Sequence, residues 1–178
     1  MSITITPTLQ AVYASVYGFI TGALGSTVPV IQGLSNRTPM PPPVPGFVLM
    51  QAIHARRLRW NIDSWQNTTP PPVTMTEEQA LEVWLQLDFY GPTSLDYATT
   101  ISTLWRDEYG CNALAPTCQP LYADEARMIP LIDAEQQYEQ RWSLDARLQY
   151  NPVTTITQAY AGSTQIGVVN VNQSYPAT

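Results

Sequence analysis

The chain contains no lysine, and this absence removes several classes of function. All eight of its basic residues are arginines, spread over 178 residues. A phosphate-binding Walker loop requires a lysine, and an enzyme that forms a Schiff base requires a side-chain amine. A protein that binds nucleic acid tightly needs a strongly basic field to release counterions from the phosphates. The sequence therefore argues against all three.

Positive charge is in the minority as well. Fourteen acidic residues against eight arginines give a net charge of −6 at pH 7. Such a charge repels a phosphate backbone and keeps a many-copy assembly soluble, so we expect no tight grip on DNA. The first residues lack the basic and apolar regions of a secretory signal, and no run approaches the roughly 20 apolar residues of a membrane-spanning helix. We therefore expect assembly in a cytoplasm and no membrane partner.

Histidine and cysteine, the usual residues of catalytic and metal sites, are scarce. His54 is the only histidine, and no nucleophile elbow of the G-x-S-x-G type accompanies it. Cys111 and Cys118 are separated by six residues, more than the about two to four of zinc ligands, and no second ligand pair follows. We expect both cysteines to be free and partly buried. The sequence predicts no catalytic residue, metal or cofactor; a hydrolytic or ligand-binding site around His54 is the alternative.

Alternating apolar and polar residues predict two long strands. Residues 81–90 and 141–150 each alternate throughout, the pattern of a strand with one buried face. Shorter strands are predicted at residues 28–32, 47–55, 58–65 and 166–171, in segments rich in β-branched and aromatic residues. The turn between the strands at 47–55 and 58–65 would carry Arg56 and Arg57.

Apolar residues at helical spacing predict two amphipathic helices. The first would start with Thr6 as its cap and end at Gly22 and Gly25. The second would begin at Ser94 and end near residue 107, and residues 110–130 are expected to be irregular. The inward side chains expected for the second helix are Leu95, Ala98, Ile101, Leu104 and Trp105.

These elements predict an α+β fold: a mostly antiparallel sheet with two amphipathic helices on one face and proline-rich loops or arms. The length suits a single domain, residues 1–178, because a chain of this size buries roughly 70% of its unfolded surface. Five prolines between residues 39 and 45 predict a stiff arm over residues 37–46. A second proline-rich loop is expected at 67–73 and a polar tail at 172–178.

Some residues are candidates for contacts with another subunit or partner. Trp84 and Tyr90 fall on the polar side of their strand, and aromatic residues are enriched in the cores of interfaces. Arg56, Arg57 and Arg59 could pair with carboxylates of a neighbouring chain, although a solvated strand turn is the alternative. The prolines of the arm have the P-x-x-P spacing of ligands for aromatic grooves, or form a rigid loop. Among the five prolines of the arm, the candidate contact residues are Pro41, Pro42 and Pro43.

The second half of the chain carries a family resemblance. Residues 138–153 read YEQRWSLDARLQYNPV and residues 166–171 read IGVVNV, and these runs resemble the neck-terminator or tail-terminator family of long-tailed bacteriophages. Residues 81–107 are similar to the strand-helix unit of that family. The order of helix, proline-rich spacer and strand near the N-terminus also matches. The resemblance covers most of the chain, but residues 111–118 have no recognisable counterpart.

The resemblance implies a non-enzymatic structural protein of the phage neck. Such a protein is a subunit of a ring, commonly a hexamer, that caps the finished tail tube and docks onto the head. The implied partners are further copies of itself, the tail tube protein, a head-side connector or adaptor and, as a further candidate, the sheath. Genome DNA would only pass through the lumen. Another head-tail connector or a baseplate subunit is the alternative, because these share small α+β domains and acidic surfaces.

Overall fold

The computed structural model describes residues 2–34, 39–66, 73–132 and 138–158. The helices are α1 (Leu9–Leu24), α2 (Ser94–Leu104) and α3 (Glu108–Leu114). The strands are β1 (Ser2–Thr6), β2 (Val30–Gln32), β3 (Phe47–Arg57), β4 (Ile62–Gln66), β5 (Val73–Glu78), β6 (Leu81–Tyr90), β7 (Gln119–Ala123), β8 (Arg127–Met128), β9 (Leu131–Ile132), β10 (Tyr138–Glu139), β11 (Arg141–Tyr150) and β12 (Val153–Gln158). The predicted α+β class is confirmed.

The larger of the two main sheets has the strand order β2-β3-β6-β11-β7, and β8 also pairs with β11. Its long central strands, β6 and β11, are paired over all ten of their residues and confirm the two alternating runs predicted from the sequence. Shorter strands predicted at 28–32 and 47–55 appear as β2 and β3. All pairings in this sheet are antiparallel except that of β2 with β3, so the mostly antiparallel sheet is confirmed.

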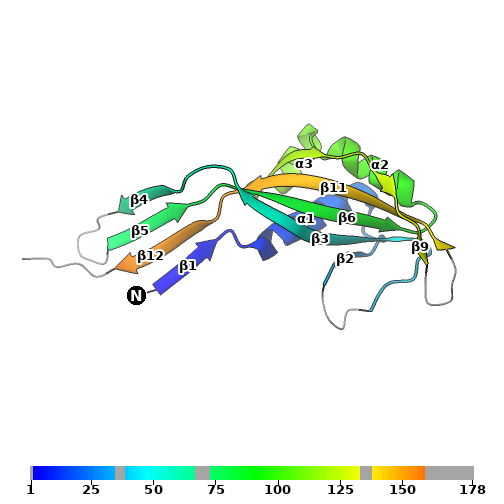
Figure 1. Ribbon diagram of the computed structural model, residues 1–178, viewed down its shortest axis with the longest axis horizontal. Coiled ribbons are helices and arrows are strands. Elements are labelled where there is room, and N and C mark those ends of the chain that lie inside the picture. Colours follow the sequence, from blue (N-terminus) through cyan, green and yellow to red (C-terminus); the bar gives the residue numbers. More distant parts are fainter. Residues whose placement is uncertain (1, 35–38, 67–72, 133–137, 159–178) are drawn as a thin grey trace, which may run out of the picture.

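The helices cover one face of this sheet (Figure 1), and the core lies between the two layers. Alternate side chains of β6 and β11 point into the core because successive residues of a strand face opposite sides. The strands contribute Val83, Leu85, Leu87, Phe89, Leu144, Ala146 and Leu148 to the core. The helices and the turn after α2 contribute Val12, Val16, Phe19, Ile20, Ala98, Ile101 and Trp105.

The first helix begins later than the sequence predicts. Thr8 caps α1, and its Oγ accepts a hydrogen bond from the Ala11 N–H at 3.2 Å. Thr6 is not the cap, because it is the last residue of β1 and is held in a ladder with β12. Gly22 lies inside the helix, and Gly25, with φ of 94°, ends it.

The chain after α2 is more regular than predicted. The second helix ends at Leu104 rather than near residue 107, and α3, β7 and β8 form within residues 108–130, most of which were expected to be irregular. Asp107 and Glu108 consequently stand at the start of α3, where the helix dipole favours acidic charge. Leu95 was predicted to point inward but is 45% exposed.

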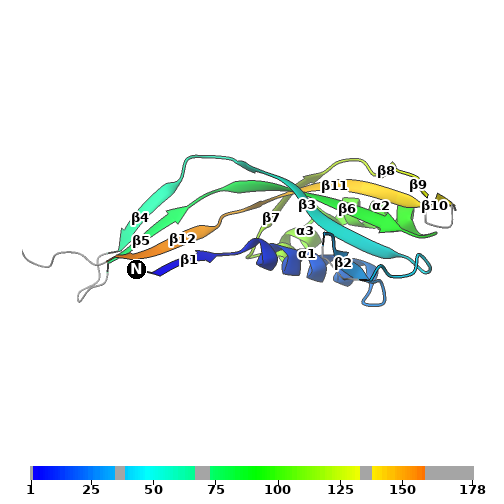
Figure 2. The same ribbon diagram turned by 60° about the horizontal axis from the view of Figure 1, so that its bottom comes forward.

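A second, four-stranded sheet is absent from the predictions. Its order is β1-β12-β5-β4, every pair is antiparallel, and we call it the β-arm. It projects beyond the end of the larger sheet, and no helix covers it in Figure 1 or in the rotated view of Figure 2. The strand predicted at 58–65 begins only at Ile62. Arg56 and Arg57 belong to β3 rather than to a turn, because β3 follows β6 as far as Leu81.

Several predicted features lie outside the described residues. They are the strand at 166–171, the polar tail at 172–178, most of the proline-rich loop at 67–73 and the start of the arm at 37–46. In the described part of the chain, no helix is long and apolar enough to span a membrane. The single domain expected for the whole chain stays a prediction, and one cooperative unfolding transition seen by circular dichroism would support it.

Candidate interaction surfaces

The face of the larger sheet opposite the helices carries a buried charged cluster. Glu82 on β6 is only 2% exposed, and its carboxylate accepts hydrogen bonds from Arg56 Nε at 2.7 Å and from Trp84 Nε1 at 2.9 Å. Arg147 Nη1 on β11 lies 3.6 Å from the same carboxylate. Burial alone would raise the pKa of Glu82, but the two hydrogen bonds and the charges of Arg56 and Arg147 outweigh it. They hold the pKa below its ordinary value of 4.5.

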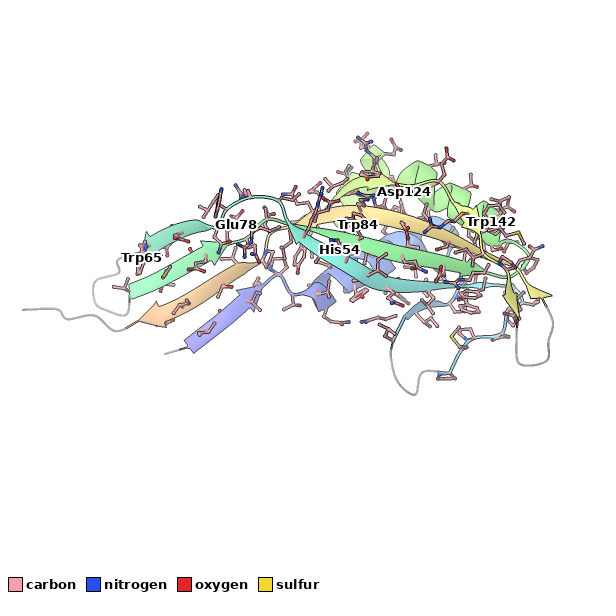
Figure 3. All side chains as sticks on the ribbon, viewed as in Figure 1. His54, Trp65, Glu78, Trp84, Asp124 and Trp142 are labelled. Carbon is pink, nitrogen blue, oxygen red and sulfur yellow. The ribbon has the colours of Figure 1, made fainter. Side chains whose placement is uncertain are left out.

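Two aromatic rings enclose the Arg147 guanidinium. Its central carbon lies 3.8 Å from the ring centroid of Trp84 and 4.4 Å from that of Tyr122 on β7, distances at which a cation attracts an aromatic face. Asp124 lies 3.7 Å from Nη2 of the same arginine. His54 meets the Trp84 ring edge-on, with the centroids 5.1 Å apart (Figure 3). Only part of the Trp84 ring is therefore free to contact a neighbouring chain.

A second ion pair lies further along the same strands. Asp88 is 3% exposed, and Arg141 Nη2 donates a hydrogen bond to it at 2.7 Å while Gln86 Nε2 donates at 3.0 and 3.1 Å. Tyr90 stacks on Phe47 with ring centroids 4.4 Å apart, and burial raises the pKa of Tyr90. Tyr90 is 5% exposed, so this predicted interface residue has little surface left for a neighbour.

The three arginines predicted to meet a neighbouring chain have partners in their own chain. Arg56 belongs to the buried cluster described above, and Arg59 forms an ion pair with Glu78. With the Gln79 amide turned so that its oxygen faces Arg57, that oxygen accepts hydrogen bonds from Nε and Nη2 at 2.6 Å. A carboxylate from another chain would have to compete with these contacts. Recruitment of the arginines by a neighbour stays a prediction.

The proline-rich segment is partly fastened to the rest of the fold. Pro42 is exposed, whereas Pro41 and Pro43 are half-buried. The segment ends against the turn that follows β6, where a Cβ on Gly91 would lie 2.3 Å from the Pro43 carbonyl oxygen. Gly91 has φ of 98°, so the turn needs a glycine for both its conformation and its space. A role of the prolines in partner binding stays a prediction.

The histidine and the cysteines considered as candidate catalytic or metal-binding residues lie on different elements, with His54 on β3 and Cys111 on α3. His54 is exposed and contacts Trp84, as described above. Among the residues that the structure places, no group of three or more His, Cys, Asp or Glu side chains could hold a metal ion. Cys111 is half-buried, as predicted, whereas Cys118 is buried rather than partly buried, and both are free. Burial raises the pKa of the Cys118 thiol to about 11.

We expect the two thiols to react with iodoacetamide at different rates in the folded protein. Cys111 should be alkylated first in mildly alkaline buffer, because Cys118 is buried and its raised pKa keeps it protonated. Mass spectrometry of peptides from a time course measures both rates, and unfolding in urea should make them similar. Equal rates in the folded protein would contradict the burial of Cys118.

The most exposed aromatic side chains lie elsewhere than predicted. Trp60, in the turn before β4, is 89% exposed, and Trp65 on β4 is 56% exposed; Figure 3 shows Trp65 on the β-arm. Ile3 and Ile5 on β1 are 65% and 51% exposed. The alternating Ser-Ile-Thr-Ile-Thr of β1 signals a strand, but nothing in the sequence shows that it pairs with β12. Exposed apolar residues gathered on one element mark an interaction surface.

The comparisons with known proteins identify the family. The model of the phage neck terminator protein family matches residues 10–174, which is most of the chain. The chain therefore belongs to the phage neck terminator family, and the resemblance stated from the sequence is confirmed. Membership gives it a structural, tail-terminating role as a component of a phage virion. No curated protein matches the chain.

A solved structure has a similar fold. It is the sheath/tube terminator of an extracellular contractile injection system, PVC, determined by cryo-electron microscopy in the extended state. The TM-score is 0.52, the identity is 11%, and the match covers 97% of this chain. The chain spans 66% of the length of that terminator. At this identity the similarity concerns the fold.

Proposed function

We propose that the chain is the subunit of a closed ring, commonly a hexamer, that terminates the tail tube at the phage neck and joins the tail to the head. The match to the neck terminator family over residues 10–174 carries the proposal. The exposed β-arm supports it, because a subunit that works in a ring needs surface for its neighbours beyond what its own core uses. Closed rotational symmetry satisfies head-to-tail contacts without open-ended growth.

The proposed partners follow from this position. They are further copies of the chain, the tail tube protein and a head-side connector or adaptor protein. The similar injection-system protein is described as a terminator of both sheath and tube, which favours the sheath as a further partner. The finished ring would sit in the virion neck, after assembly in the host cytoplasm. No membrane contact is part of the proposal.

We expect the ring to let genome DNA pass without holding it. The chain has no lysine and a net charge of −6, so it offers little attraction to phosphates, and a conducting channel must not bind what it conducts. Fluorescence anisotropy with labelled duplex DNA at moderate salt should show no tight binding. Saturable binding at low protein concentration would contradict a lumen that lets DNA pass without holding it.

The experiment for the proposed function is the native mass of the purified protein across a range of concentrations, with negative-stain images of the same samples. The proposal predicts closed rings of several subunits, alone or after addition of tail tubes. A protein that stays monomeric at every concentration and is not recruited by tubes would overturn it.

A further inference from the structure

A row of apolar side chains crosses the β-arm from one edge to the other. The registers place Ile3 opposite Ile156, Ile156 opposite Met75, and Met75 opposite Trp65. Residues directly opposite each other in antiparallel strands share one face of the sheet. The row ends on the two edge strands, where Ile3 is 65% and Trp65 is 56% exposed.

The other face of the β-arm is polar at the same level. The neighbouring row consists of hydroxyl side chains and runs through Thr4, Thr155, Thr76 and Ser64. At this level the β-arm therefore has an apolar row on one face and a polar row on the other, whereas the next row on the apolar side, Ile5, Thr154, Glu77 and Asp63, includes two carboxylates. Within the described residues no second layer covers either face (Figure 2).

Both edges of the β-arm are open in the described part of the chain. β1 pairs only with β12, and β4 pairs only with β5. Proteins usually protect such edges with lysine, proline, inward charges or a bulge. β1, with the sequence SITIT, has none of these, and β4 has a single charge, Asp63. Each edge strand has five residues, so the two edges match in length.

The directions of the strands show which occupant suits these edges. Three successive antiparallel pairs separate β1 from β4, so the two edge strands run in opposite directions. When a second copy stands beside the first in the same orientation, its β1 is antiparallel to β4 of the first. The sheet then continues from copy to copy, and the apolar row continues with it from Trp65 to the next Ile3.

We propose that β4 of each subunit pairs with β1 of the next, so that a second copy of this chain occupies each edge of the β-arm. The proposal rests on the ring proposed above and names the surface that builds it. The contact is head-to-tail, which closes into a ring, whereas pairing of β1 with β1 would stop at a dimer. The uncharged β1 offers no like charge to Asp63 of its neighbour.

Disulfide trapping tests the contact in the full-length protein. Ile3→Cys and Trp65→Cys are combined in one chain that also carries Cys111→Ser and Cys118→Ala. Within a chain the two new cysteines lie three strand spacings apart, about 14 Å, whereas a disulfide needs Cα atoms within about 7 Å. A disulfide between them can therefore form only between copies. Circular dichroism verifies that the variant is folded.

The outcomes separate this contact from the ring itself. The proposal predicts that oxidation converts most chains into covalent species larger than dimers, and that either cysteine alone gives no such species. If native mass shows rings but oxidation gives no such covalent species, the β4 to β1 contact is overturned and another surface must build the ring. Dimers from Ile3→Cys alone would also overturn it, because they indicate pairing of β1 with β1. A protein that forms no ring at all would overturn the proposed function as well.

A second variant tests the occupant without cysteine chemistry. Ile3→Lys places a charge at the open edge, whereas Leu95→Lys, a matched change of an exposed apolar residue on α2, leaves the β-arm intact. Ile3→Lys should abolish rings at concentrations where the unmodified protein and Leu95→Lys form them. Rings that persist in Ile3→Lys but no longer bind tail tubes would overturn the proposal and assign the edge to the tube protein.

Discussion

Replacement of Trp105 by alanine is expected to lower the free energy of unfolding by about 3–5 kcal/mol, the usual range for a large buried aromatic side chain. Trp105 is fully buried and meets Phe19 edge-on at 5.5 Å between ring centroids. Its Nε1 donates a hydrogen bond to the Arg147 carbonyl at 3.0 Å and so ties the turn after α2 to β11. Urea denaturation followed by far-ultraviolet circular dichroism measures the loss.

The matched control is Trp60→Ala. Trp60 is 89% exposed, so the same chemical change should alter the free energy of unfolding by no more than about 0.5 kcal/mol. A comparable loss in both variants would contradict the packing of Trp105 between the helices and the larger sheet. The two variants therefore separate a core tryptophan from one that is available to a partner.

Replacement of Glu82 by alanine is expected to cost about 3 kcal/mol, the lower end for a broken buried ion pair. Arg147 keeps its position between Trp84 and Tyr122 and its contact with Asp124 but loses the Glu82 carboxylate, and its side chain is only 17% exposed. The cost stays at the lower end because Arg56, at 57% exposure, can turn to water. Glu125→Ala, at an exposed position, is the control and should have little effect.

The contribution of Glu82 should also depend on pH. The pKa of Glu82 in the folded protein lies below 4.5, so the unfolded chain binds the proton more readily. The stabilisation is complete above the unfolded pKa and is lost as the pH falls through the folded pKa. The difference in unfolding free energy between the unmodified protein and Glu82→Gln should shrink on acidification below about pH 4.5. A constant difference would contradict the charged state of this carboxyl.

The long strands could be predicted because their pattern is local. Residues 81–90 and 141–150 each repeat apolar and polar positions over ten residues, and the structure pairs these two runs with each other. A half-buried strand imposes this alternation whatever its neighbours are. The helix at 94–104 is likewise visible from its own spacing.

Other elements could not be predicted because their signals depend on distant parts of the chain. Thr6 and Thr8 are both suitable caps by residue type, and only the pairing of β1 with β12 decides between them. The β-arm joins strands from residues 2–6, 62–66, 73–78 and 153–158, and no local pattern reveals that they meet. α3 has only seven residues, too few for a clear periodicity.

The candidate interface could be predicted only in part, because its contacts also depend on distant parts of the chain. Alternation places Trp84 and Tyr90 on the polar side of β6, but it does not show that Arg147 covers one and Phe47 stacks on the other. The arginines of β3 and the following turn are identified by charge, whereas their partners Glu78, Gln79 and Glu82 lie about 20 or more residues further on. Exposure, which singles out Trp60 and Trp65, is a property of the fold.

The most direct measurement of the central claim is the position at which the protein binds a tail tube. Gold-labelled protein is added to tubes assembled from the tail tube protein, and the sites of labelling are counted in negative-stain electron micrographs. Termination at the neck predicts label at one end of each tube, no label along the wall, and no further growth from the labelled end. Label along the wall, or growth past labelled ends, would contradict the account.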